Sequence, residues 1–323
     1  MSDPAPGNGL AGALLVTDPA GATGGAAPSP GWARTAGAAA RVGLGRPELW
    51  PLALLAYLVR GGLALHLVPV VVVPSTVGLA TFIGPTALTP AGPSEAFAQF
   101  LAALLVGLTA WLVGGGLVAA AAELALLGRV PPSAGRRVTA GSAARALIVR
   151  LAALLPLLAV LAWGLPRIIG AAYRELTLPS DTAAPVALRV LRDVPEVVVL
   201  VLLAWLAGET VGGIAVRRFA LLGEGGGAAL RGALRHVATR PATTLATSAV
   251  AACGSVVLVG PGLAAAALAW QRLGRALAAG SDPVAIVLLT ALFVAAWLLG
   301  LVLAGAASSW RGLAWTFEVR RTH

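Results

Sequence analysis

Long runs of apolar residues recur along this chain, and they constrain its fold more than any other feature. A helix needs roughly 20 apolar residues to cross the ~30 Å hydrocarbon core of a bilayer. Of the 323 residues, 58% are hydrophobic and only 11% are charged, whereas soluble domains carry roughly 25% charged residues. We therefore expect an all-α integral membrane protein. The predicted spans are residues 50–73, 97–127, 147–170, 194–216, 242–270 and 284–310.

A recurring pattern indicates that the six helices form three helical hairpins. Trp-Leu-x-Gly occurs at 111–114, 205–208 and 297–300, each time in the second helix of a predicted hairpin. Repeats of this kind are typical of supersecondary units copied along a chain. Gly and Pro interrupt the odd-numbered segments, as at Gly260-Pro261-Gly262, but not the even ones. Such breaks are typical of a midplane binding site in a transporter, and also of ordinary packing between membrane helices.

The arginines predict the orientation of the chain. All 23 basic residues are Arg and none is Lys, which, with abundant Ala, Gly and Pro, is typical of a high-GC bacterium. Positively charged loops stay in the cytoplasm, so we expect a multi-pass protein of the bacterial plasma membrane with both termini cytoplasmic. The opposite side has six arginines, at 167, 174, 189, 192, 272 and 275. The cytoplasmic side has sixteen, at 34, 41, 46, 129, 136, 137, 145, 150, 217, 218, 231, 235, 240, 311, 320 and 321.

Two segments lie outside the predicted helices. Residues 1–45 are rich in Ala, Gly, Pro and Ser and have few large apolar side chains, so we expect a disordered cytoplasmic tail that cannot offset its chain entropy by burial. The membrane domain then covers residues 46–323. Residues 74–93 contain no charged side chain and are rich in Pro, Thr and Gly. We expect them to form an outer loop or to re-enter the membrane. Re-entry requires that protein or water satisfies the hydrogen-bonding groups of their backbone.

Short amphipathic helices are predicted in two of the loops. In Gly227–Arg240, Leu230, Leu234 and Val237 fall on one face, with the arginines beside it. This pattern favours a helix in the inner interface, with Arg231, Arg235 and Arg240 near anionic lipid phosphates. An ordinary connector with snorkelling arginines is the alternative. Ala184–Asp193 is the outer counterpart, with Leu188 and Leu191 against Arg189 and Arg192.

Four polar side chains lie within predicted spans. Charge inside hydrocarbon is costly, so each is a candidate site residue. Arg60 lies about ten residues into the first segment and Glu209 about eight from the end of the fourth, so both lie roughly 12–15 Å deep at 1.5 Å per residue. Arg60 is therefore expected to pair with Glu209 or with Glu123, and His66 lies farther towards the outer face. The set is either a buried ion pair that fixes helix register or an anion site or proton path.

Several kinds of catalytic site have no counterpart in the sequence. We find no His-Glu-x-x-His, no Gly-x-Ser-x-Gly and no Walker A loop, and no Asp falls within a predicted span. The absence of Lys removes Schiff-base chemistry, and the single cysteine excludes an intrachain disulfide. We therefore expect no enzymatic activity, no cofactor and no metal site.

The segment Gly232-Ala-Leu-Arg-His-Val-Ala-Thr-Arg-Pro241 carries a resemblance. A basic amphipathic stretch that ends in Arg-Pro before a membrane helix resembles uncharacterised bacterial six-span families, including the membrane domain of some glycerophosphodiester phosphodiesterases. The similarity covers about the last third of the chain, with an echo at Arg46-Pro47. The catalytic phosphodiesterase domain is absent, so the resemblance implies a hairpin-repeat membrane domain and no phosphodiesterase activity.

Together these patterns predict a non-enzymatic scaffold, accessory or lipid-contacting membrane module. Expected partners are membrane lipids, above all anionic ones, and either a second copy of the chain or another membrane protein. Nucleic acid is not expected, because the arginines cluster at helix ends and form no basic domain. The alternative is a small permease for an anionic or lipidic substrate that uses Arg60 and Glu209.

Overall fold

The computed structural model describes residues 31–68, 70, 88–89, 92–93, 95–130, 138–178, 180–181, 184 and 186–321. These residues are mostly helical, with one short antiparallel strand pair, β1 (Leu88–Thr89) and β2 (Gly92–Pro93). The helices are α2 (Trp32–Gly45), η1 (Pro47–Leu49), α3 (Trp50–Tyr57), η2 (Leu58–Gly62), α4 (Leu63–Leu67), α6 (Glu95–Ala110), η3 (Trp111–Gly115), α7 (Gly116–Gly128), α8 (Ala140–Ala153), α9 (Leu155–Thr177), α10 (Val186–Asp193), α11 (Pro195–Leu222), α12 (Gly226–Thr239), α13 (Pro241–Ala278) and α14 (Pro283–Arg321).

Six helical stretches are long and apolar enough to cross a membrane, which confirms the predicted all-α membrane fold. Their surfaces carry large apolar side chains such as Val106 and Val256, which are 69% and 70% exposed. Such extensive apolar exposure suits lipid rather than water. The six spans are Pro47–Leu67, Ala98–Gly128, Leu155–Glu175, Pro195–Leu222, Pro241–Ala278 and Pro283–Arg321.

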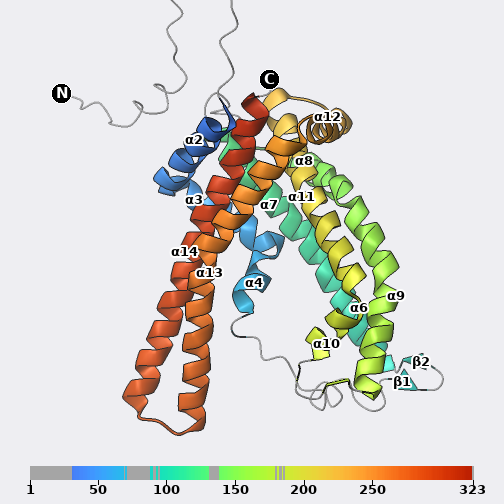
Figure 1. Cartoon of the computed structure of the whole chain (residues 1–323), viewed down its shortest axis with the longest axis vertical. Helices are drawn as coiled ribbons and strands as arrows, with labels where there is room; N and C mark the ends of the chain where they lie inside the picture. Colours follow the sequence, from blue (N-terminus) through green and yellow to red (C-terminus); the bar gives the residue numbers. More distant parts are fainter. Residues whose placement is uncertain are drawn as a thin grey trace, which may run out of the picture.

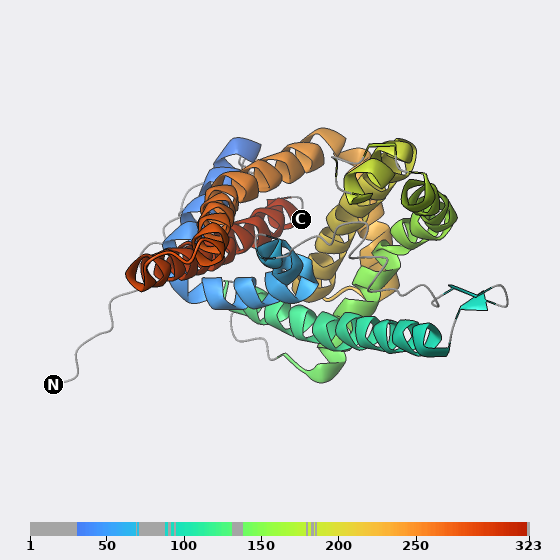
Figure 2. The same ribbon diagram turned by 90° about the horizontal axis from the view of Figure 1, so that it is seen from below.

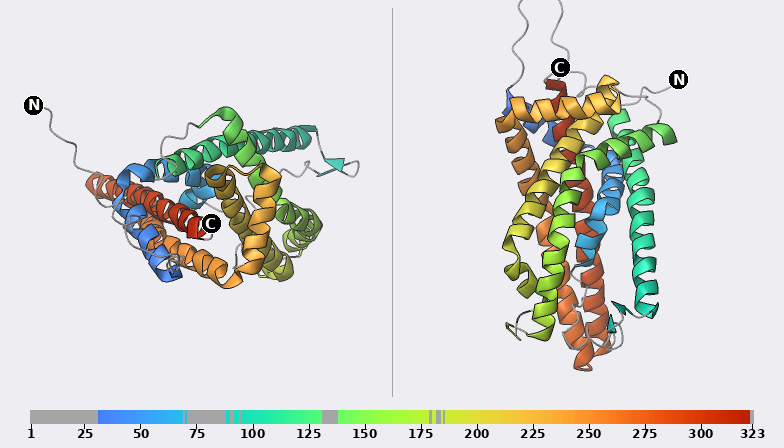
Figure 3. Two further views of the ribbon diagram at one scale, coloured as in Figure 1. Left: turned by 90° about the horizontal axis from the view of Figure 1, so that it is seen from above. Right: turned by 90° about the vertical axis from the view of Figure 1, so that its right-hand side faces the viewer.

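The spanning helices form two groups that meet at one end and diverge towards the other (Figure 1). The α13–α14 hairpin belongs to one group, and α9 and α11 belong to the other, with α4 between them (Figures 1 and 2). At the shared end, α8 and α12 lie across the spanning helices (Figure 3). We call this the Arg-rich end, because the described arginines that the sequence assigns to one side belong to the elements gathered there.

Proline opens most of the long helices. Pro195, Pro241 and Pro283 are the first residues of α11, α13 and α14, and Pro156 is the second residue of α9. Proline suits this place because the first turn has no acceptor for its N–H and its φ is already helical. α11 ends at Gly223, whose φ of 69° gives the left-handed cap that glycine adopts without strain.

The third span begins later than the sequence predicts. Residues 140–153 form the separate helix α8, and α9 starts at Leu155 instead of residue 147. Leu154 leaves helical geometry, with φ −91° and ψ 0°. Pro156 explains the break, because its ring clashes with the carbonyl four residues earlier and its nitrogen cannot donate. α8 has its own start signal, a reciprocal capping box between Thr139 and Ser142.

Helix interruptions do not follow the predicted odd-and-even pattern. The first span contains the π-helical turn η2, and the second span contains another, η3, at the first Trp-Leu-x-Gly copy. The fifth span is one continuous helix through Pro261. The helix of the first span is described as far as Leu67, and residues 71–73 of the prediction lie outside the described residues.

Part of the segment predicted as a disordered tail is a helix. Residues 32–45 form α2, which packs along α14, whereas residues 1–30 lie outside the described residues. Small residues allow this close contact: Ala39 is fully buried, and a Cβ on Gly43 would lie 2.7 Å from the Cα of Trp310. The Trp32 indole donates to Thr247 Oγ1 at 2.9 Å and anchors the start of α2 on α13. The composition of residues 32–45 does not predict an ordered helix, because the burial of α2 depends on its contact with α14.

The opposite end carries α10, which the sequence predicts as an outer amphipathic helix over Ala184–Asp193. The helix is present, but its faces are not used as expected. Leu188 and Leu191 are exposed, whereas Arg189 is buried and lies 3.2 Å from the Glu175 carboxylate. A buried carboxylate on α9 thus turns the predicted polar face inward. Most of the predicted loop 74–93 lies outside the described residues.

Candidate functional site

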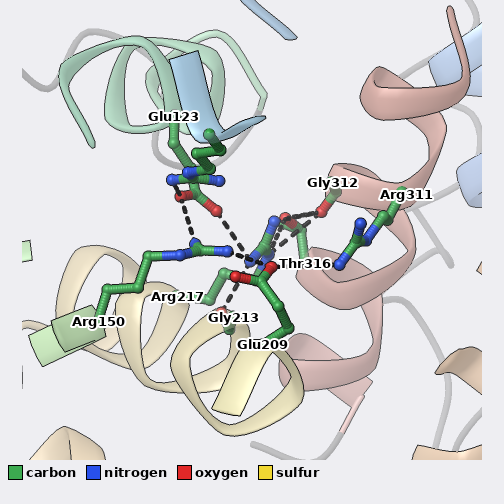
Figure 4. Close-up of polar contacts among 9 residues, drawn as sticks. Glu123, Arg150, Glu209, Gly213, Arg217, Arg311, Gly312 and Thr316 are labelled. Atoms are coloured by element: carbon green, nitrogen blue, oxygen red, sulfur yellow. Dashed lines mark hydrogen bonds and ion pairs between the residues drawn. The ribbon is translucent and has the colours of Figure 1, made fainter. Parts of the chain in front are cut away.

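Five of the helical elements bring charged side chains together near the Arg-rich end. Arg60 comes from η2, Glu123 from α7, Arg150 from α8 and Arg311 from α14. α11 supplies the remaining two, Glu209 and Arg217. We call these six residues the charge cluster. Figure 4 shows how the side chains of five of them converge from the surrounding helices: Glu123, Arg150, Glu209, Arg217 and Arg311.

Glu123 is the centre of the charge cluster. Its carboxylate accepts from the Arg60 guanidinium, lies 3.2 Å from Nη1 of Arg150 and lies 3.1 Å from Nη1 of Arg217. Its side chain is only 8% exposed. Three guanidinium groups on one carboxylate compensate for the cost of burying its charge, which would be several kcal/mol if it stood alone. Of the two partners that the sequence leaves open for Arg60, the structure selects Glu123.

Arg150 joins the two carboxylates. Its Nη2 donates to Glu209 Oε2 at 2.5 Å while its Nη1 reaches Glu123. Glu209 also accepts from Nη2 of Arg311 at 3.3 Å. The result is a chain of alternating charges that runs from Arg60 through Glu123, Arg150 and Glu209 to Arg311. Arg60 and Glu209 are therefore members of one network without being paired with each other.

Arg217 is tied mainly to backbone carbonyls. Its Nη1 donates to the Gly213 carbonyl at 2.7 Å, and its Nη2 donates to the Gly312 carbonyl at 2.9 Å. Its Nε donates to the hydroxyl of Thr316 at 3.2 Å. The side chain is 4% exposed. Arg217 thus fastens α11 to α14 with nearly every donor used.

The backbone around Arg60 is irregular. Gly61 has φ 103°, in the left-handed region that side chains other than glycine rarely adopt, and it lies inside the π-helical turn η2. π-turns are frequent at functional sites. In this turn the guanidinium of Arg60 is directed at Glu123 on α7, the neighbouring helix. Glycine at 61 therefore helps to place the Arg60 side chain in the charge cluster.

The charge cluster has more positive than negative charge. Four guanidinium groups face two carboxylates, which leaves an excess of two positive charges. Burial opposes the charged form of Arg150, but the nearby Glu209 and Glu123 carboxylates prevail and raise the pKa of Arg150. Its guanidinium is therefore charged at all physiological pH values. With two guanidinium groups in excess of its carboxylates, the charge cluster can hold negative charge.

His66 does not belong to the charge cluster. It is fully buried, its Nδ1 lies 3.1 Å from the Gly62 carbonyl, and its ring packs edge-on against Tyr57. Trp297 donates to the His66 carbonyl at 3.0 Å. These contacts place His66 in the packing between the first and last spans. A proton path that includes His66 together with Arg60 and Glu209 has no connecting hydrogen bond among the described residues.

A second basic site lies at the Arg-rich end, beside α12. A pocket of about 510 Å³ is lined by Arg218, Arg231, Arg235, His236 and Arg240, together with small residues of α12. We call this the α12 pocket. It brings together all three residues that the sequence predicts as lipid-contacting. Arg218 and His236 were not predicted as pocket residues, because nothing in the local sequence places the end of α11 beside α12.

The lining residues of the α12 pocket differ in how far their charge is already balanced. Arg218 pairs with Glu224 at 2.5 Å, and His236 lies 3.7 Å from Glu318. Arg231 and Arg235 are exposed, and neither forms an ion pair in the described part of the chain. The inward face of α12 consists of Ala229, Ala233 and His236, whereas Leu234 of the predicted apolar face is 52% exposed.

Three arginines of the charge cluster were not predicted as site residues, because their positions in the sequence indicate only the orientation of the chain. Arg150, Arg217 and Arg311 were counted among the arginines of one side, and their positions next to spans were the only hint of burial. Among the described residues, no three His, Cys, Asp or Glu side chains converge to hold a metal ion. Comparison with protein-family models, curated proteins and solved structures finds no match.

Proposed function

We propose that this protein is a non-enzymatic, lipid-contacting module of the bacterial plasma membrane that binds anionic headgroups in the α12 pocket. The observation that carries the proposal is the convergence of four arginines on one pocket of about 510 Å³. Arginine suits this role because its planar fork of N–H donors matches the oxygens of a phosphate.

The arginine distribution supports the orientation that this role requires. Sixteen arginines against six favour a cytoplasmic Arg-rich end, with both termini on that side. Anionic lipids give the cytoplasmic leaflet a negative surface potential, worth about 1 kcal/mol for each nearby Arg. The α12 pocket then faces the leaflet surface that attracts it most strongly.

The free donors of the α12 pocket support a headgroup ligand over a structural role. Within the described part of the chain, Arg231 makes one hydrogen bond, of 3.4 Å, to the Gly227 carbonyl on its own helix. Arg235 and Arg240 are exposed. A structural ion pair would need an acidic partner, and Glu224 is already engaged by Arg218.

The test uses purified protein in nanodiscs and compares lipid retention by native mass spectrometry. The variant R231A/R235A should bind phosphatidylglycerol at least tenfold more weakly than the wild type, with phosphatidylcholine binding unchanged. R272A/R275A is the matched control, because these two arginines are also exposed on a helix, and Arg275 makes the same 3.4 Å bond to the carbonyl four residues earlier, here that of Gln271. Equal loss in both variants, or none in either, would refute the α12 pocket as the lipid site.

The role as a scaffold or accessory subunit adds an expectation about assembly. Close helix packing at glycine, such as Gly262 of α13 against Gly300 of α14, is already used within the chain. In this role, part of the exposed apolar surface of the spanning helices would contact a second copy or another membrane protein instead of lipid. Purification in mild detergent should give an oligomer or a stable complex, and a lone monomer without lipid preference would count against this role.

A permease for an anionic or lipidic substrate is the second candidate. It is favoured by the charge cluster, because Arg60 and Glu209 lie in one network inside the spanning region. Reconstituted vesicles should then show anion flux that R60A abolishes while the protein still folds. Binding without flux would leave the lipid-contacting module as the function.

A further inference from the structure

The charge cluster holds an excess of charge where the apolar runs of the spanning helices end. Arg60, Glu123 and Glu209 lie within such runs, whereas Arg311 directly follows the predicted span 284–310. All four helices that carry Arg60, Glu123, Glu209 and Arg311 are candidate membrane spans. Unbalanced charge in such a place is costly and marks a functional site by default.

The excess is located at the two ends of the alternating chain. Arg311 is 41% exposed at its side chain, and its one contact in the described structure is the 3.3 Å bond to Glu209. Arg60 is 26% exposed, and its one ion-pair partner among the described residues is Glu123. Arg150 and Arg217, by contrast, are 11% and 4% exposed and have several acceptors each. The unused donors are therefore accessible on Arg311 and Arg60.

We propose that the charge cluster binds one phosphate-type oxyanion, with the guanidinium of Arg311 as its principal contact. Arg60 and Arg217 hold it by charge. A phosphate monoester carries roughly −1.5 to −2 charge at neutral pH and presents three acceptor oxygens, so one such group balances the excess of two. A carboxylate would leave one charge uncompensated. The same chemistry belongs to free phosphate and to the headgroup of phosphatidic acid.

This inference does not depend on the proposed lipid site in the α12 pocket, and it concerns the same charge cluster as the second candidate function. The charge cluster and the α12 pocket have no residue in common. Substitution of Arg311 should also leave the fold intact, because Glu209 keeps its 2.5 Å contact with Arg150. The two sites can therefore be tested separately in the same full-length protein.

The experiment measures anion binding by the full chain in phosphatidylcholine nanodiscs. The probes are inorganic phosphate and dioctanoyl phosphatidic acid, with uncharged dioctanoylglycerol as the control ligand. Isothermal titration should give one site per chain, and the ligand should raise Tm, because binding to the folded state stabilises it. R311A should weaken binding at least tenfold, R311K less, and R60A should also weaken it. R272A, an exposed arginine of α13 near the opposite end, should behave as wild type.

Each outcome separates the sources of the anion or overturns the proposal. Binding of both probes indicates a site for free phosphate that also accepts a headgroup, and binding of phosphatidic acid alone indicates a lipid site; either supports the proposal if R311A reduces it. The proposal is overturned if neither probe binds, or if R311A and R311K bind as well as wild type. Loss of binding in R231A/R235A with R311A unaffected would also overturn it and would assign the anion to the α12 pocket.

Discussion

Nη2 of Arg150 lies 2.5 Å from Oε2 of Glu209, and this contact joins α8 to the fourth span. The same guanidinium reaches Glu123 on α7 at 3.2 Å. α8 is not itself a spanning helix, but it supplies the cation that links two of them. Arg150 lies in the last turn of α8, which ends at Ala153 directly before α9 begins at Leu155, so the break between the two helices helps to place its guanidinium in the charge cluster.

Replacing Arg150 should destabilise the fold strongly. R150A leaves Glu209 with the partly exposed Arg311 alone and removes one of three cations from Glu123. Breaking a buried ion pair costs about 3–5 kcal/mol, and we expect about 3 kcal/mol here. The measurement is unfolding in mixed micelles. R145A is the control, because Arg145 is exposed on the same helix and should cost no more than about 0.5 kcal/mol. Equal costs for the two variants would contradict the ion-pair network.

A double-mutant cycle should distinguish the partner of Arg60. The cycle of R60A with E123Q should give a coupling free energy of about 1–3 kcal/mol, because Arg60 contacts Glu123 directly. The cycle of R60A with E209Q should give about 0.5 kcal/mol or less, because only indirect contacts link that pair. Both cycles are read from the free energy of unfolding. A larger coupling to Glu209 would show that the contact with Glu123 is wrong.

Two glycines of α13 should respond in opposite ways to alanine. A Cβ on Gly262 would lie 2.9 Å from the Cα of Gly300 on α14, and backbone cannot move aside cheaply. We expect G262A to cost about 1–3 kcal/mol through overpacking. A Cβ on Gly274 would meet nothing within 4 Å, so G274A should be neutral or stabilising by up to about 1 kcal/mol. Thermal unfolding of both variants tests this pair, and similar shifts would argue against close α13–α14 contact.

The buried arginine of α10 should matter more than its exposed neighbour. Arg189 pairs with Glu175 at 3.2 Å, and both side chains are almost fully buried. R189A leaves that carboxylate without its 3.2 Å cation and should lower the unfolding midpoint. R192A changes the same charge on the same helix, but Arg192 is exposed, so its effect should stay within about 0.5 kcal/mol. Unfolding midpoints that fall equally in both variants would contradict the inward face of α10.

Features that depend on local hydropathy were predicted well from the sequence. The six spans match because a helix needs a long apolar run to cross a bilayer, whatever its neighbours are. Arg60, Glu123 and Glu209 were singled out for the same reason, because a charge in such a run is conspicuous by itself. The start of the third span was wrong, since the Leu154–Pro156 break interrupts a run that remains apolar on both sides.

Features that depend on contacts between distant segments could not be predicted in this way. The order of α2 depends on α14, and the burial of Arg189 depends on a carboxylate of α9. Arg217 and Arg311 are near the ends of apolar runs, where an arginine is ordinarily solvated. Their membership in the charge cluster follows only from the way α11 and α14 pack together.

By itself, the sequence determined that the chain spans a membrane six times, that its arginines gather at one end, and that Arg60 lies among apolar residues. These features follow from the free energy of transferring each side chain from water into the bilayer, which depends on the residue type and its position in the sequence. Only the tertiary structure decided that Arg60 pairs with Glu123, that Arg150 bridges Glu123 and Glu209, and that four cations meet two anions. Such pairing depends on how each helix is rotated and which helices touch, and hydropathy carries no information about either.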